Sequence, residues 1–389
     1  MSSWKSGPMP RWFRRPVSVG AVVVLALLLP LVAVAPARAA DDAGRIDARF
    51  VALGGATGLL GAPTTEVYDA GPDGRARDYA GGRIFWSPGT DAWEVLGAVG
   101  DRYLAVGGPG GFLGFPTAAA TAPTTADGGL EQVFSGGRIL SSAATGPHAV
   151  SGAVLIEFLT IGATVSYLGY PTSDTTAAGD GFVTSFQRGT ITWSPGAGSV
   201  VTGAWVSTVR RATAAEMPFT YRSGCPVPPA RLRRIVLPYY DWNDVPRFGT
   251  LVANASVVSD LQRVFRKAFA ARFPIKKMDP VDLYRGNDVL SMAADNTSVF
   301  NCRKVTGNPY RLSQHSYGNA IDINTVENPY VTSSRVYPSR GVPFLKRSVS
   351  RKGMILPGTP IASAMAAEGW PWGARWSHPD YQHFSSNGG

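Results

Sequence analysis

Three of the four histidines in the chain lie within its last 75 residues, close to acidic residues. His315 precedes Asp322 by seven residues, with Gly318 between them. This spacing is too wide for one helical turn and fits a loop that leads into a strand over residues 320–323. Both side chains could then reach one metal ion, and His383 would complete a His-Asp-His set of ligands.

Three protein ligands and one water are typical of catalytic zinc sites rather than structural ones. Zinc lowers the pKa of its water to near neutrality and polarises a carbonyl group. A carboxylate must then move protons, and Asp380, three residues before His383, is placed for this role. His378 is expected to line the site or to support it structurally. The alternatives are an ordinary buried His315–Asp322 pair and a surface role for Asp380.

The elements that would position these residues mix helices and strands. An amphipathic helix is predicted over Val257–Phe273 and a strand over Arg234–Tyr240. A second helix should begin at Thr359-Pro360 and end at Gly369. A long polar loop is expected over about Asp279–Ser313. Three nearby tryptophans are expected mostly in the core, with one lining the cleft: Trp370, Trp372 and Trp376.

The first 39 residues are typical of an export signal. Four basic residues precede an apolar run over residues 17–35, and Ala37-Arg38-Ala39 fits a signal peptidase site. We therefore expect a signal peptide over 1–39, a secreted mature chain and no stable membrane span after cleavage. An uncleaved anchor is the alternative, and the choice between Sec and twin-arginine export stays open.

The only two cysteines are Cys225 and Cys302. In an oxidising compartment they are expected to form a disulfide. Closing this loop would stabilise the fold by about 4 kcal/mol in the chain-entropy model. Without nearby histidines, the pair is a poor zinc site.

Charge is divided sharply along the chain. Residues 40–205 have 8 Arg, no Lys and 15 acidic residues, whereas residues 206–389 have 24 basic and 12 acidic residues. A basic half favours anionic polymers, and for an exported protein the bacterial wall is the best candidate. No basic-aromatic motif of the usual nucleic-acid modules is present, so we expect no nucleic-acid partner.

A short motif recurs three times in the N-terminal half, at spacings of 53 and 55 residues: Leu59–Pro63, Phe112–Pro116 and Tyr167–Pro171. A second motif, first present at Tyr79–Ile84, keeps phase with it. Such a period predicts one supersecondary unit per copy. The copies resemble LGFP repeats, which implies attachment of residues 40–205 to a cell-envelope polymer. The aromatic residues are expected mainly in the core, and His148 is expected to be inert.

The pattern Ser-x-His-x2-Gly-x-Ala-x-Asp, followed by Asp-x2-His, resembles the M15 family of zinc peptidases and is nearest to its endolysin-like branch. The likeness covers about 150 residues. It implies an α+β (M15/hedgehog-like) peptidase domain over 206–389 in a multi-domain chain. The implied zinc ligands are His315, Asp322 and His383, with Asp380 as the catalytic acid. It also implies that Arg303 holds a substrate carboxylate or the oxyanion and that Ser313 supports the loop.

The resulting hypothesis is a secreted, wall-associated zinc peptidase that cuts peptidoglycan stem peptides. Resemblance favours the L-Ala–D-Glu bond, and a D-Ala–D-Ala carboxypeptidase with the same site is the alternative. A third possibility, from another class, is a wall-binding protein without activity. Every expected metal and acid position is filled, which argues against that third hypothesis.

Overall fold

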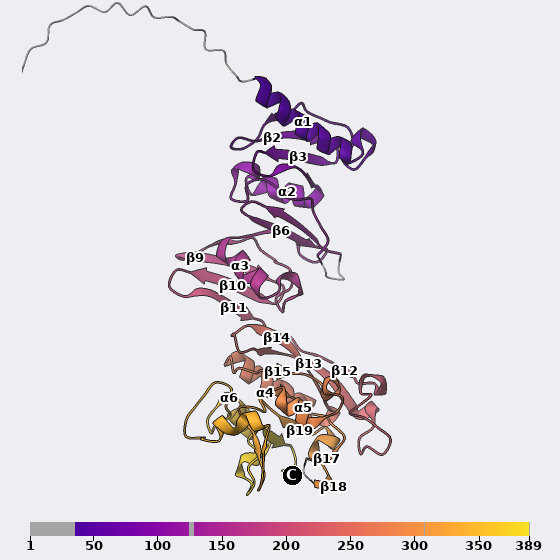
Figure 1. The fold of residues 1–389 in the computed structure, drawn as a ribbon, viewed down its shortest axis with the longest axis vertical. Helices are drawn as coiled ribbons and strands as arrows, with labels where there is room; N and C mark the ends of the chain where they lie inside the picture. Colours follow the sequence, from indigo (N-terminus) through magenta and orange to yellow (C-terminus); the bar gives the residue numbers. More distant parts are fainter. Residues whose placement is uncertain (1–35, 124–127, 307, 389) are drawn as a thin grey trace, which may run out of the picture. The chain divides into compact units, whose positions relative to one another are not determined.

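The structure, a computed structural model, describes residues 36–123, 128–306 and 308–388 (Figure 1). The predicted signal peptide falls largely on residues outside these ranges and stays a prediction. Among the described residues, no helix is both long enough and apolar enough to cross a membrane.

Three similar units follow one another in the N-terminal half. Each has a helix, a single 3-10 turn and an antiparallel meander in which neighbouring strands pair. The first unit has α1 (Pro36–Ala52), β1 (Tyr68–Asp69), β2 (Arg75–Tyr79), β3 (Gly82–Ser87) and β4 (Asp91–Leu96). The second has α2 (Gly97–Ala105), β5 (Leu130–Phe134), β6 (Gly137–Ser142) and β7 (Gly146–Ser151). The third has α3 (Gly152–Thr160), β8 (Thr176–Ala178), β9 (Gly181–Phe186), β10 (Gly189–Ser194) and β11 (Gly198–Gly203).

The repeated motif makes the same turn in each unit. Its glycines, Gly61, Gly114 and Gly169, have φ angles of 68°, 62° and 72°. This left-handed conformation is accessible to glycine without a steric penalty. The sequence-based expectation of tight turns at these motifs is therefore confirmed.

The motif also supplies the core of each unit. The leucine before each glycine is fully buried: Leu60, Leu113 and Leu168. The preceding side chain is exposed in the first two copies, whereas Tyr167 of the third is buried and lies 4.5 Å from Phe248, ring centre to ring centre. Most of the aromatic residues expected in the core are buried or partly buried: Phe85, Phe115, Tyr170 and Trp193.

The C-terminal half is built on a three-stranded antiparallel sheet of β12 (Thr208–Arg211), β13 (Leu232–Tyr240) and β14 (Pro246–Asn254). The predicted strand lies within β13. Helix α4 (Val258–Ala270) packs on this sheet and on α6 (Pro360–Ala367). Both helices were predicted, with α4 ending three residues early and α6 two. Their buried apolar side chains and those of the sheet form one core.

The prediction of a long polar loop over residues 279–313 was wrong. This segment contains a 3-10 turn (Val281–Tyr284), α5 (Asp288–Ala293), β16 (Asn296–Thr297), β17 (Lys304–Val305) and β18 (Asn308–Leu312). Each element is too short to give a hydrophobic period. The side chain of Asn287 caps α5 by accepting a hydrogen bond from the amide of Leu290 at 3.1 Å. The predicted disulfide joins Cys302, in this segment, to Cys225.

Two short strands meet in the middle of this half. The strand β19 (Ala320–Asp322) pairs antiparallel with β22 (His383–Ser385), and Asp322 lies opposite His383. On its other side, Asp322 bridges to Ser298 through 3.0 Å hydrogen bonds in both directions. A third small pair, β20 (Tyr330–Val331) and β21 (Val336–Tyr337), lies between them in sequence.

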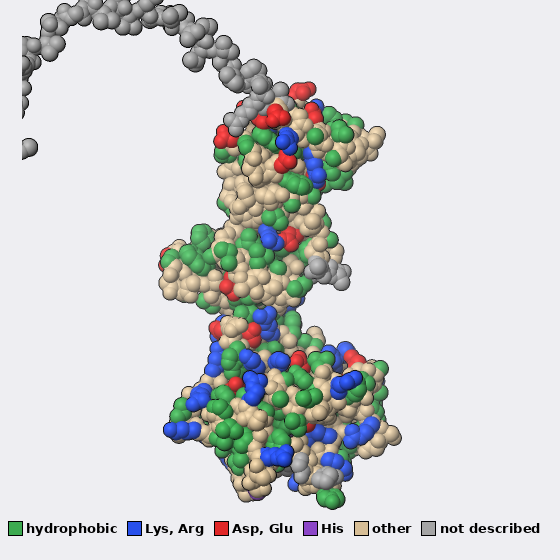
Figure 2. Space-filling model, viewed as in Figure 1, with side chains coloured by type: hydrophobic (Ala, Val, Ile, Leu, Met, Phe, Trp, Pro, Cys, Tyr) green, Lys and Arg blue, Asp and Glu red, His purple; other side chains and the backbone are tan. Residues whose placement is uncertain are grey.

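Lys and Arg side chains are distributed widely over the C-terminal half. On the face shown in Figure 2 they are spread out and do not gather in one patch. The positive charge of residues 206–389 therefore acts as a broad field and gives no single binding patch on this face.

Candidate metal centre and active site

His315, Asp322 and His383 form a buried cluster at the pairing of β19 and β22. Their ligand atoms all lie within 4.8 Å of one another, and this is the only such His, Cys, Asp or Glu group among the described residues. The three side chains are 4%, 4% and 6% exposed. The structure thus brings together the three residues that the sequence predicted as ligands, and their role as ligands stays a prediction.

His315 is held by a single 3-10 turn, Gln314–Tyr317. Ser313 caps this turn by accepting a hydrogen bond from the amide of His315 at 3.3 Å, which is the supporting place expected for it. The turn ends at Gly318 with φ 67°, where a Cβ atom would lie 2.8 Å from the amide nitrogen of Asn254. The glycine of the motif is therefore required by both conformation and space.

The orientation of the His315 ring leaves one nitrogen for the cluster. Its Nδ1 lies 2.6 Å from the carbonyl oxygen of Val299, which is an acceptor, so Nδ1 carries the proton. Its Nε2 then lies 3.1 Å from Oδ2 of Asp322 and 3.3 Å from Nδ1 of His383. An outer carbonyl that fixes the tautomer in this way is typical of histidines that bind metals.

The three donor atoms have the spacing of a tetrahedral face. Their separations are 3.0, 3.1 and 3.3 Å. Ligands about 2.1 Å from a tetrahedral zinc ion stand about 3.4 Å apart. Two imidazoles and one carboxylate, all inside the protein and open to a cavity, are also a donor set that zinc accepts. The residues present therefore fit a zinc ion.

The cluster shifts the ionisation of its members. Burial alone would raise the pKa of Asp322, but His315 and His383 hold that pKa well below its usual range. Burial alone would lower the pKa of His315, but the carboxylate of Asp322 raises it. Asp322 is therefore ionised, as a metal ligand must be.

Asp380 lies at the edge of the same cavity and is 9% exposed. Burial and the charge of Asp322 raise its pKa to about 8. Its Oδ1 is buried and has no hydrogen-bond partner among the described residues. Its amide donates to the carbonyl of Gly373 at 3.0 Å, where a Cβ atom would lie 3.1 Å from the Cβ of Asp380. The carboxyl is thus held tightly and is available to a ligand in the cavity.

A cavity of about 270 Å³ opens over the cluster. Arg303 and the exposed His378 line it, so His378 lies near the mouth and outside the cluster. Trp376 also lines it, with its ring centre 5.3 Å from that of His383. Of the three tryptophans, Trp370 is in the core and Trp372 packs beside it, so Trp376 is the one in the cleft.

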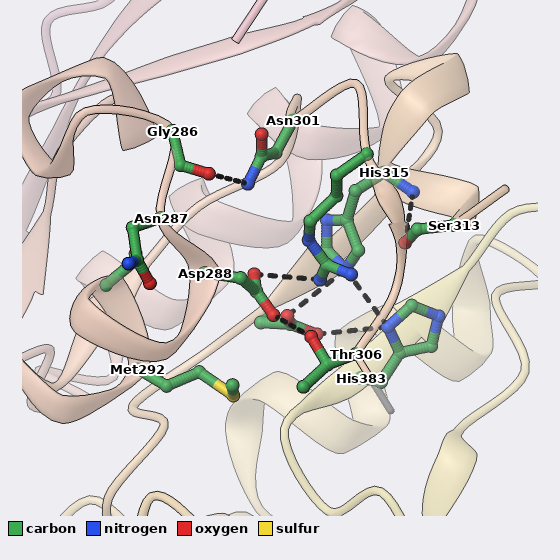
Figure 3. A network of polar contacts seen from close by, with 12 residues as sticks. Gly286, Asn287, Asp288, Met292, Asn301, Thr306, Ser313, His315 and His383 are labelled. Atoms are coloured by element: carbon green, nitrogen blue, oxygen red, sulfur yellow. Dashed lines mark hydrogen bonds and ion pairs between the residues drawn. The ribbon is translucent and has the colours of Figure 1, made fainter. Parts of the chain in front are cut away.

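The close view of the site shows partners that sequence analysis missed (Figure 3). Asp288 pairs with Arg303 and accepts a hydrogen bond from Thr306. The carbonyl of Val299 also went unrecognised. A backbone acceptor has no signature in sequence, whereas Asp288 follows a helix-capping Asn287, which is a signal that α5 begins there.

A second pair of buried carboxyl groups lies outside the cavity. Burial and the neighbouring Asp295 raise the pKa of Glu327 to about 8, and burial also raises the pKa of Asp295. The amide of Val326 donates to Asp295 at 2.9 Å. His148, in the repeats, lies 3.0 Å from the carbonyl of Thr145 and belongs to no metal cluster found in the described ranges.

Comparison with protein families gives two matches. Residues 306–386 match a peptidase M15 family model described as D-alanyl-D-alanine carboxypeptidase. Residues 60–111, 113–164 and 168–208 match the LGFP repeat. Comparison with curated proteins finds no similar sequence. The protein therefore has three LGFP repeats followed by an M15 peptidase domain, the multi-domain arrangement predicted from its sequence. The exact boundary at 205/206 stays a prediction.

Proposed function

We propose that the M15 peptidase domain over residues 206–389 is a zinc peptidase that hydrolyses the stem peptides of peptidoglycan. One observation carries this proposal. The buried cluster of His315, Asp322 and His383 opens into a cavity that also contains the unpartnered carboxyl oxygen of Asp380. Ligands and a proton-transfer group in one cavity are the parts that metal-assisted hydrolysis requires.

A zinc ion held by the three side chains would supply a Lewis acid and would lower the pKa of a water molecule. The remaining steps belong to the protein. Ionised Asp380 accepts a proton from the water that attacks the peptide carbonyl carbon. As the carbon–nitrogen bond breaks, Asp380 returns that proton to the leaving amine. A pKa near 8 suits both transfers, because the group must gain and lose a proton at near-neutral pH.

Arg303 is proposed to act on the charged part of the substrate. Its side chain lines the cavity and is 17% exposed. A guanidinium in this place can donate hydrogen bonds to the developing oxyanion or to a carboxylate of the stem peptide. Both roles place negative charge on the substrate close to the cluster.

The three LGFP repeats are proposed to hold the enzyme on a cell-envelope polymer. They precede the catalytic domain in the same chain, so attachment would raise the local concentration of the peptidase at its substrate. The excess of basic residues in 206–389 would favour the anionic wall. Both features support secretion and association with the wall.

Two bonds remain as candidate targets. The L-Ala–D-Glu bond is our first choice, because the motif around the ligands is nearest to the endolysin-like branch. The D-Ala–D-Ala bond is the second choice and is favoured by the description of the matched family model. Each bond leaves a different product.

The test is digestion of purified peptidoglycan by the protein, with and without a zinc chelator, followed by mass spectrometry of the released peptides. Products with a new D-Glu amino terminus, lost when the chelator is present, would support the endopeptidase. Loss of a single terminal D-Ala would support the carboxypeptidase. Protein that contains zinc but yields neither product would contradict the proposal and favour a role in wall binding.

A further inference from the structure

Arg303 is held by one carboxylate at the wall of the cavity. Its terminal nitrogen Nη2 lies 2.8 Å from Oδ1 of Asp288, and its Nη1 donates to the carbonyl of Lys304 at 2.9 Å. Its Nε is buried and has no hydrogen-bond partner among the described residues. Two nitrogens of the guanidinium are therefore fixed by the protein, while a third remains to be satisfied.

Asp288 is itself oriented from its other side. Thr306 donates a hydrogen bond from its hydroxyl to Oδ2 of Asp288 at 2.7 Å. One carboxylate oxygen therefore serves Arg303 and the other serves Thr306, which fixes the plane of the carboxylate. Figure 3 shows this chain of contacts beside His315 and His383. The side chains of Asp288 and Arg303 are only 14% and 17% exposed, so their interaction is screened less than that of a surface pair.

The backbone around this network is tied to the metal centre. The amide of Arg303 donates to Oγ of Ser316 at 3.0 Å, and that hydroxyl donates back to the carbonyl of Arg303 at 2.9 Å. Ser316 directly follows His315 in the same turn. The amide of Asn301 donates to the carbonyl of His315 at 3.1 Å, and its side chain donates to the carbonyl of Gly286 at 3.2 Å. Asp288, Arg303 and His315 are therefore held in one frame.

We infer that Asp288 and Thr306 are positioning residues that hold the guanidinium of Arg303 toward the substrate in the cavity over His315, Asp322 and His383. This inference rests on the proposed function. A long arginine side chain has many rotamers, and fixing one of them before the substrate binds removes an entropic cost from the reaction. Asp288 does not itself need to touch the substrate.

A simple stabilising ion pair would behave differently. Such a pair would affect folding and leave the kinetics of the folded enzyme unchanged. A positioning pair would act through Arg303, so that its removal would matter only while Arg303 is present. A double-mutant cycle separates these two roles.

The experiment compares Asp288→Asn, Thr306→Val, Arg303→Ala and the double variant Asp288→Asn/Arg303→Ala in the full chain. Kinetics are measured on a soluble stem peptide that contains both candidate bonds. Asp288→Asn should lower kcat/KM about 100-fold, the scale of a misplaced group. Thr306→Val should lower it about fivefold, as expected for one hydrogen bond. In the Arg303→Ala background, Asp288→Asn should have no further effect.

Controls separate positioning from folding. Asp244→Asn removes a comparable pair, with Arg272 at 2.8 Å, on a part of the domain outside the cavity, and it should leave kcat/KM unchanged. Zinc content and the melting curve of each variant show whether the site and the fold remain. Asp288→Glu should restore part of the activity, since the carboxylate is kept.

A second measurement does not need activity. The buried Nε–H of Arg303 should give a slowly exchanging NMR signal, identified by its loss in Arg303→Lys. This signal should broaden or exchange faster in Asp288→Asn. Equal kinetics and an unchanged signal in a folded, zinc-containing Asp288→Asn variant would overturn the inference. An inactive wild-type protein would instead contradict the proposed function, and the NMR result would still decide whether Asp288 positions Arg303.

Discussion

Asp322 and His383 occupy directly opposite positions on the paired strands β19 and β22, and Nδ1 of His383 lies 3.0 Å from Oδ1 of Asp322. The two residues are 61 positions apart in the chain. In an antiparallel pair, opposite side chains lie on the same face of the sheet. The strand register therefore places both groups in the cluster, and His315 reaches them from the preceding turn.

Removing any one member of the cluster should abolish tight zinc binding. We expect His315→Ala, Asp322→Ala and His383→Ala each to weaken zinc affinity by more than the roughly 10–100-fold that loss of an outer partner costs. Zinc retained after dialysis against a competing chelator measures this effect. His378→Ala is the matched control, because this exposed histidine lies near the cavity and outside the cluster. Full zinc content in His383→Ala would contradict the assignment.

Asp380→Asn should keep its zinc and lose about 10²–10⁴-fold in kcat, the usual contribution of a proton-transfer group. A base works only when ionised, so the wild-type rate should rise as the pH rises through the pKa of Asp380. Burial and Asp322 raise that pKa to about 8, and a bound cation would bring it down from there. The acidic limb of the pH–rate profile should therefore lie below about pH 8 and disappear in Asp380→Asn. An unaltered acidic limb would assign the proton transfer to another group.

Gly373→Ala should disturb the site without removing any functional group. An added methyl group would lie 2.8 Å from the carbonyl oxygen of Asp380, 3.1 Å from its Cβ and 3.3 Å from the Cβ of His383. Overpacking of this kind typically costs about 1–3 kcal/mol. We expect a lower melting temperature and weaker zinc retention, measured by calorimetry and metal analysis. Gly358→Ala is a control in open space, although its own φ of 84° adds some strain. Wild-type zinc affinity in Gly373→Ala would show that the backbone can relax there.

Glu327→Gln should make the folded domain less sensitive to alkaline pH. Burial and Asp295 raise the pKa of Glu327 from its ordinary 4.5 to about 8. A carboxyl with a raised pKa contributes stability that is fully present below pH 4.5 and is lost as the pH rises to about 8. The variant should therefore melt higher than the wild type at pH 9, by roughly 2–4 °C for each kcal/mol gained. Parallel melting curves from pH 4 to pH 9 would show that Glu327 is ionised in the folded protein.

Sequence patterns predicted the parts of the fold that have a repeated or periodic signal. The motif of the three LGFP units recurs in phase, and helix α4 has a clear apolar face. The glycines of the repeated motif and Gly318 indicated turns because no other residue adopts their backbone conformation easily. The ligand cluster was predictable because histidine is rare in this chain.

The segment over residues 279–313 could not be predicted in the same way. Its elements have two to six residues, too few for a period to show. Asp288 and Thr306 are 18 positions apart and meet only because α5 and β17 are brought together by tertiary contacts. Such pairing depends on the folded chain, and a single sequence contains no record of it.

The disulfide between Cys225 and Cys302 has a consequence for how the protein is handled. Cys302 directly precedes Arg303, so the covalent bond anchors the segment that presents the guanidinium. The three residues of the cluster lie on other segments and are joined by hydrogen bonds and strand pairing. A thiol reagent would therefore release the arginine side of the pocket while it leaves the zinc side in place. Protein purified in reducing buffer could bind its metal fully and still process its substrate poorly.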